Sequence, residues 1–143
     1  MATYYSDLKN QHHGDVSICQ TFSGATAGHE GNYVDMQLTD GPVFGVLQFG
    51  SVTGSGVDID VKLQECATTN GTYTDMTNGA FTQSYTETSA DNVLEIINAR
   101  RTARYVRAYM VITGATSVTS APVCVTILGQ KKILGGAGYQ TDG

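Results

Sequence analysis

The strongest constraint on the fold is a segment in which apolar and polar side chains alternate without interruption. Residues 57–64 read Val-Asp-Ile-Asp-Val-Lys-Leu-Gln. Successive side chains of a β-strand point to opposite faces of its sheet, so this segment has one dry face and one wet face. The segment therefore predicts a strand in a sheet whose one face is buried.

Other segments carry strand and turn signals of the same kind. Asn70-Gly71 is a strong hairpin-turn signal. Residues 43–49 are apolar on both faces, as in a central strand, and residues 92–97 fit either a helix or a strand. Strands are predicted over residues 33–38, 43–49, 57–64, 72–76, 104–113 and 122–128, with turns at 39–42, 70–71 and 78–79.

Length and composition narrow the fold class. The chain has 143 residues, enough for one domain. A hydrophobic fraction of 41% argues against disorder, and a charged fraction of only 15% argues against long Glu/Lys helices. The chain contains no run of about eighteen apolar residues, so no membrane-spanning helix is predicted. The N-terminus lacks the pattern of a signal peptide. We predict an all-β chain forming a single, jelly-roll-like β-sandwich.

The sandwich is expected over residues 33–129. Residues 1–32 are polar and contain four glycines, so they are predicted to form an extended N-terminal arm with one short strand at most. Residues 130–143 are predicted to form a Gly-rich C-terminal tail. Such arms can cover large surfaces of neighbouring subunits when they become ordered on assembly.

No constellation of residues indicates catalysis or metal binding. The three histidines, His12, His13 and His29, lie in the polar lead-in and are expected to be solvated. Asp58 and Asp60 share a strand face but lack the further oxygen ligands that Ca²⁺ needs. The cysteines, at 19, 66 and 124, are widely spaced and predict neither a zinc site nor a disulfide framework. We predict no enzymatic activity and no cofactor.

Two groups of side chains are candidates for partner binding. The first is a basic cluster, for which docking of an acidic partner competes with local pairing to neighbouring carboxylates. The second is a set of tyrosines, which suit protein interfaces and, less well without Trp, a sugar platform. The net charge of −5 argues against nucleic acid. The candidates are Tyr4, Tyr5, Arg100, Arg101, Arg104, Tyr105, Arg107, Tyr109 and Tyr139.

The pattern over residues 33–129 resembles small β-sandwich structural proteins of tailed bacteriophages. The resemblance lies in residues 34–38, 57–65, 71–76 and 104–107. It implies a minor capsid, cement or head-decoration protein that binds the major capsid protein and belongs to the virion, assembled in the host cytoplasm. A homotrimer is the expected oligomer. The alternative is a surface, tail or fibre module that binds a host receptor or carbohydrate through Tyr105 and Tyr109.

Overall fold

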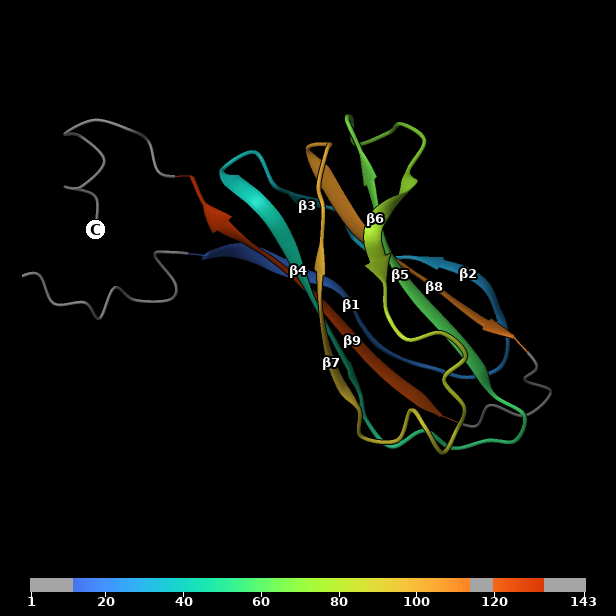
Figure 1. The fold of residues 1–143 in the computed structure, drawn as a ribbon. Coiled ribbons are helices and arrows are strands. Elements are labelled where there is room, and N and C mark those ends of the chain that lie inside the picture. Colours follow the sequence, from blue (N-terminus) through green and yellow to red (C-terminus); the bar gives the residue numbers. More distant parts are fainter. Residues whose placement is uncertain (1–11, 114–119, 133–143) are drawn as a thin grey trace, which may run out of the picture.

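The computed structural model describes residues 12–113 and 120–132, and these residues form two antiparallel β-sheets. Figure 1 shows the sheets as two layers. The strands are β1 (His12–Phe22), β2 (Thr26–Glu30), β3 (Val34–Asp35), β4 (Thr39–Phe49), β5 (Asp58–Cys66), β6 (Thr74–Ala80), β7 (Leu94–Ala99), β8 (Tyr105–Thr113) and β9 (Ala121–Lys131).

The strand order is that of a jelly roll. One sheet, called sheet A here, has the order β1-β9-β4-β7, and the other, called sheet B, has the order β2-β8-β5-β6 with β3 beside β8. With the two-residue β3 set aside, each sheet holds four of eight strands. In chain order, sheet A then reads 1-8-3-6 and sheet B reads 2-7-4-5, which is the strand order of a jelly roll made of two Greek keys. The prediction of a jelly-roll-like β-sandwich is confirmed.

The core fills the space between the sheets with the inward side chains predicted from alternation. On β5 these are Ile59, Val61 and Leu63, all fully buried, while the intervening Asp60 and Lys62 stay partly exposed. The aliphatic face of β8 is buried in the same way. The segment 92–97, whose type the sequence left open, contributes most of β7, which pairs with β4.

Two of the predicted turns are bulges within strands. Register shifts between Asp40 and Val43, where Gly41 has a φ of 72°, so the chain bulges and β4 continues. In β6 the extra residues follow Asp75, and Asn78 has a φ of 57°. Gly and Asn tolerate positive φ, which bulges use as readily as turns do. The Asn70-Gly71 prediction is confirmed as the β5–β6 connection.

The predicted N-terminal arm is wrong for residues 12–30. These residues form β1, an edge strand of sheet A, and β2, an edge strand of sheet B. In β1 only Ser17, Ile18 and Phe22 are buried. An edge strand that buries so few side chains has a weak apolar pattern in the sequence, which is why the prediction missed it. At the other end, β9 extends to Lys131, and residues 1–11 and 133–143 of the expected arm and tail lie outside the described residues.

Ser17 links the two sheets at a bulge in β1. The register of β1 with β9 shifts between Val16 and Ile18, so Ser17 has no partner residue on β9, and it is buried. Its hydroxyl donates to the backbone carbonyl of Asn32 at 2.7 Å and accepts from the backbone N–H of Ala108 at 2.8 Å. Because Ala108 belongs to β8 and Asn32 to the β2–β3 connection, this one hydroxyl of sheet A satisfies a backbone N–H of sheet B and a carbonyl of its adjoining loop.

We expect Ser17→Ala to lower the free energy of unfolding by about 1–3 kcal/mol, because the buried N–H of Ala108 loses its partner and the carbonyl of Asn32 loses a donor. Urea denaturation followed by circular dichroism measures the change. Ser23→Ala is the matched control, since Ser23 is exposed in the β1–β2 connection and should stay within about 0.5 kcal/mol of the parent. Equal effects of the two substitutions would show that the link between the sheets contributes nothing.

Candidate functional site

Of the residues predicted to bind a partner, those that the structure describes do not form one patch. Tyr4, Tyr5 and Tyr139 lie outside the described residues. The other candidates divide among three places. Arg100 and Arg101 follow β7, and Arg104 directly precedes β8. Tyr105, Arg107 and Tyr109 share the outward face of β8, because strand side chains alternate.

Arg104 forms an ion pair with a carboxylate of sheet B. Its Nε donates to Oδ1 of Asp35 at 2.9 Å and its Nη2 donates to Oδ2 at 2.6 Å, so the pair is bidentate. The guanidinium also lies 4.9 Å from the ring centre of Tyr105. Arg104 is therefore occupied within the fold, as the local-pairing alternative predicted.

Arg107 holds together the middle of the outer face of sheet B. It donates to Glu30 of β2 at 2.8 Å and to Oε1 of Gln64 on β5 at 3.1 Å. Its guanidinium stacks 4.0 Å from the ring centre of Tyr73. Gln64 in turn donates to Asp75 of β6, which also accepts from Lys62 at 2.6 Å. A chain of polar contacts thus crosses all four long strands of sheet B.

Arg100 and Arg101 lie at the end of β7, beside the bulges of β4 and β6. They line an open hollow of about 640 Å³ with Asp40, Asn78 and Asn98. Arg101 donates to the backbone carbonyls of Thr39 and Ala103, whereas the side chain of Arg100 is exposed. These two arginines therefore sit apart from Arg107.

Glu65 fixes the loop that carries these arginines. Its buried carboxylate accepts hydrogen bonds from the N–H of Thr102 at 2.7 Å, the hydroxyl of Thr102 at 2.6 Å and the N–H of Ala103 at 2.8 Å. Burial acts to raise the pKa of Glu65, but these hydrogen bonds and the nearby charge of Arg101 outweigh it and lower the pKa. The carboxylate stays ionised and positions the β7–β8 loop.

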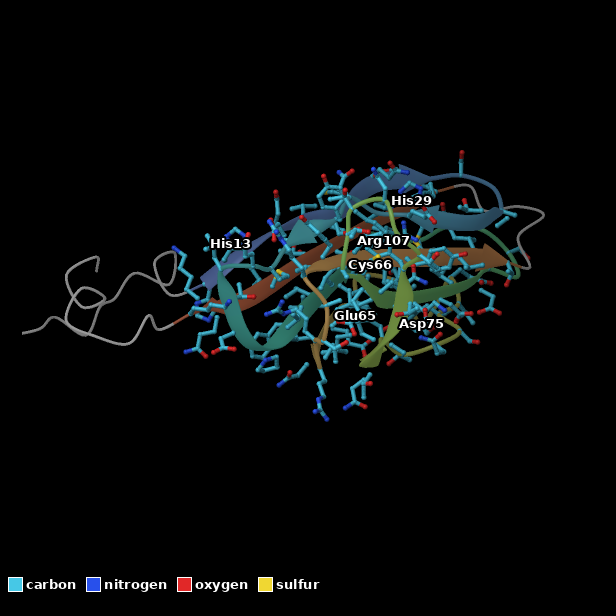
Figure 2. All side chains as sticks on the ribbon, turned by 90° about the horizontal axis from the view of Figure 1, so that it is seen from above. His13, His29, Glu65, Cys66, Asp75 and Arg107 are labelled. Atoms are coloured by element: carbon cyan, nitrogen blue, oxygen red, sulfur yellow. The ribbon has the colours of Figure 1, made fainter. Side chains whose placement is uncertain are left out.

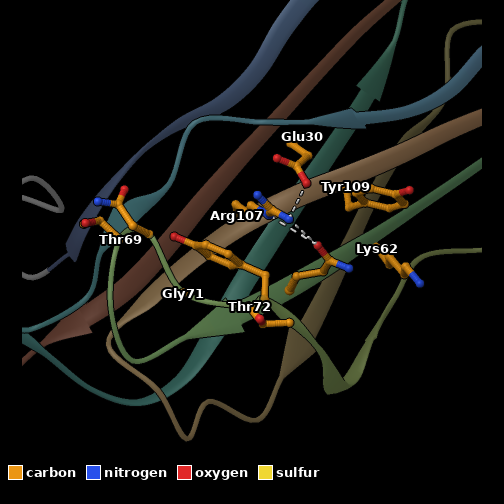
Figure 3. A pocket seen from close by; sticks show the side chains of 10 residues that line it. Glu30, Lys62, Thr69, Gly71, Thr72, Arg107 and Tyr109 are labelled. Atoms are coloured by element: carbon orange, nitrogen blue, oxygen red, sulfur yellow. Dashed lines mark hydrogen bonds and ion pairs between the residues drawn. The ribbon is translucent and has the colours of Figure 1, made fainter.

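A pocket of about 620 Å³ opens on the outer face of sheet B beside the β5–β6 loop. Figure 3 shows Arg107 at its centre with Glu30 next to it, Tyr109 and Lys62 to one side, and Thr69 and Thr72 of the loop to the other. Tyr109 lines this pocket, whereas Tyr105 of the same strand does not. The sequence placed the two tyrosines on one face and could not separate them.

The outer face of sheet A has the opposite character. From Val43 on, every second residue of β4 is buried and points inward, so the three residues between them point outward. Residues paired directly across neighbouring strands point to the same face, so each of these outward residues of β4 defines a row across the sheet. None of the twelve residues in the three rows is charged. The rows are Gly14-Leu128-Phe44-Asn98, Val16-Thr126-Val46-Ile96 and Cys19-Cys124-Gln48-Leu94.

Large apolar side chains protrude from this uncharged face. Ile96 is 63% exposed, Leu94 60% and Val16 40%, and these are three of the five exposed large apolar residues in the described ranges. Beside them lies a hollow of about 340 Å³ lined by Cys19, Cys124 and Pro122 among others. Burial, and next the neighbouring Cys19 thiol, raises the pKa of the Cys124 thiol.

The histidines lie on strands and not in loops as expected. His13 of β1 contacts the backbone carbonyl of Asp35 at 3.0 Å, and the ring of His29 on β2 meets that of Phe22 edge-on at 4.9 Å. Figure 2 shows His13 and His29 far apart.

Across residues 12–113 and 120–132, no three His, Cys, Asp or Glu side chains gather as a metal site. The same ranges hold no helix of the length and apolarity that a membrane crossing requires.

The ion pair of Asp35 predicts a pH dependence. The hydrogen bonds from Arg104 hold the pKa of Asp35 at about 2, below the ordinary 3.8. Because the folded-state pKa is depressed, the stabilisation is present above about pH 4 and is lost as the pH falls towards 2. In Arg104→Ala we expect the pKa of Asp35 to return towards 3.8, measured by NMR titration of the carboxyl carbon.

The same substitution should make the loss of stability between pH 4 and pH 2 shallower. Lys62→Ala is the matched control, because it removes another ion pair of sheet B and leaves Asp35 untouched. An unchanged titration of Asp35 in Arg104→Ala would contradict the assignment.

The comparisons with known proteins support the fold alone. No protein-family model matches the chain, and no curated protein matches it. The chain is similar to a chain in the solved structure of infectious bursal disease virus, Gx strain, with a TM-score of 0.60 and 9% sequence identity. The match covers 90% of this chain but only 34% of the other, so the chain spans about a third of its structural neighbour.

Proposed function

We propose that the protein is a non-enzymatic structural component of a virus particle, which cements or decorates the shell by packing against the major capsid protein across capsomer junctions. The outer face of sheet A carries this proposal, because its three central rows are mostly apolar and hold no charged residue. The fold is consistent with the role, since jelly rolls occur in viral capsid domains and the structural neighbour comes from a virus. Jelly rolls also serve other functions, so the outer face of sheet A supports the role more specifically than the fold does.

An uncharged face suits a molecule that must pack closely against others. The chain carries a net charge of −5, yet none of that charge lies in the three rows of sheet A. Packing against these rows therefore desolvates no charge of this protein, and burial of an unpaired charge would cost several kcal/mol. The matching partner surface is uncharged for the same reason. Exposed apolar patches with a polar surround mark protein interaction sites.

The three rows form the centre of a contact. Four strands about 4.8 Å apart, taken over the five residues that the rows span at about 3.4 Å each, give a footprint of roughly 330 Å² per partner. About 650 Å² on both sides is less than the roughly 1,200 Å² of a specific interface, so stable binding requires further contact around the rows or several subunits acting together. Ile96 and Leu94 protrude beside the hollow at Cys124, so a complementary surface can interlock with the face.

We expect Ile96→Lys to weaken binding to the shell at least about tenfold, because the substitution buries an unpaired charge in the contact. The measurement is co-sedimentation of the purified protein with empty shells assembled from the major capsid protein of the same virus. Ile96 is already exposed, so the melting temperature should change by only a few degrees.

Thr113→Lys is the matched control, since it adds the same side chain at an exposed position of β8 in sheet B. Its binding should equal that of the parent. The proposal is wrong if the parent protein does not bind the shells, and the assignment to sheet A is wrong if Ile96→Lys binds as tightly as the parent. The oligomeric state, for which the phage resemblance implies a trimer, is measured by light scattering of the free protein.

A further inference from the structure

We propose that the pocket beside the β5–β6 loop binds a neutral saccharide. Its lining comes from β2, β5, β8 and residues 69–73 of the loop. The pocket lies on sheet B, opposite the face assigned to shell contact, so the two proposals stand on different residues and can fail separately.

The charges of the pocket are already paired within the protein. Arg107 pairs with Glu30, and Lys62 pairs with Asp75 just outside the lining. Two positive and two negative charges cancel, and the guanidinium of Arg107 is further held by Gln64 and by the ring of Tyr73. The pocket therefore presents no unpaired charge to attract a charged ligand, and its remaining groups suit a ligand without charge.

The polar groups that remain free are mostly hydroxyls. Within the part of the chain that the structure describes, the side chains of Thr69, Asn70, Thr72 and Tyr109 line the pocket without a hydrogen-bond partner. A hydroxyl donates and accepts, and the amide of Asn70 does both with its two ends. Sugar hydroxyls, which also donate and accept, match such a set.

Aromatic rings provide the apolar part of the site. Tyr109 and Tyr73 both line the pocket and are half-buried. Lys62 lies 5.5 Å from the ring centre of Tyr109 and Arg107 lies 4.0 Å from that of Tyr73, so the other face or the edge of each ring offers rigid contact area to the apolar face of a sugar ring. Gly71 lets the loop pack closely, because a Cβ there would collide with Cys66 and Thr68. The volume of about 620 Å³ falls in the usual range for small-ligand sites.

The test uses the full chain on an array of immobilised neutral, sialylated and sulfated oligosaccharides. The best neutral oligosaccharide is then titrated in solution, followed by NMR shifts, to about 10 mM so that weak millimolar binding is detected. We expect binding to at least one neutral oligosaccharide and a loss of about tenfold or more in Tyr109→Ala, equivalent to one lost contact.

Tyr105→Ala is the matched control, because Tyr105 lies on the same face of β8 outside the pocket, and it should bind within twofold of the parent. Asn70→Ala, at an exposed loop position, should weaken binding without affecting folding, which guards against misfolding of Tyr109→Ala. The proposal is overturned if no neutral oligosaccharide binds, if only charged ones bind, or if Asn70→Ala and Tyr105→Ala behave alike. None of these outcomes bears on shell binding by sheet A.

Discussion

The fold depends on burying one face of each sheet against the other. Ile59, Val61 and Leu63 of β5 are fully buried between the sheets, and each such side chain contributes about 1.5–3 kcal/mol relative to exposure. Because strand side chains alternate, this burial leaves every second residue on an outer face. The jelly roll therefore has two outer faces whose chemistry the core does not dictate, and these faces differ sharply.

The arginine and lysine of the sheet B pocket are paired with carboxylates, whereas the three central rows of sheet A carry no charge at all. On sheet B, Arg107 and Lys62 each find a carboxylate on a neighbouring strand. Exposed ion pairs of this kind add little stability, but they leave hydroxyls and tyrosine rings as the groups free for a ligand. On sheet A the exposed Leu94 and Ile96 have no partner in the monomer that satisfies their apolar surface. The outer face of sheet B thus suits a hydroxyl-rich ligand such as a sugar, and the outer face of sheet A suits a protein surface.

The candidate sites were only partly visible in the sequence. Four arginines within residues 100–107 suggested one basic patch, yet Arg104 and Arg107 pair with Asp35 and Glu30, which lie 69 and 77 positions away. Such partners leave no local signal. The sheet A face is built from β1, β4, β7 and β9, and only the apolar character of residues 43–49 on both faces hinted at it.

The sequence by itself determined which segments are strands in the middle of the sheets and which of their side chains point inward, because alternation with a period of two is a local property. Only the tertiary structure decided the order of the strands, since pairing joins residues far apart in the chain. It also turned the predicted arm into β1 and β2, because an edge strand is held by backbone hydrogen bonds and by contacts such as Ser17 to Ala108, which need few apolar residues. Gly41 and Asn78 became bulges for the related reason that a positive φ permits both a turn and a bulge, and the neighbouring strand selects between them.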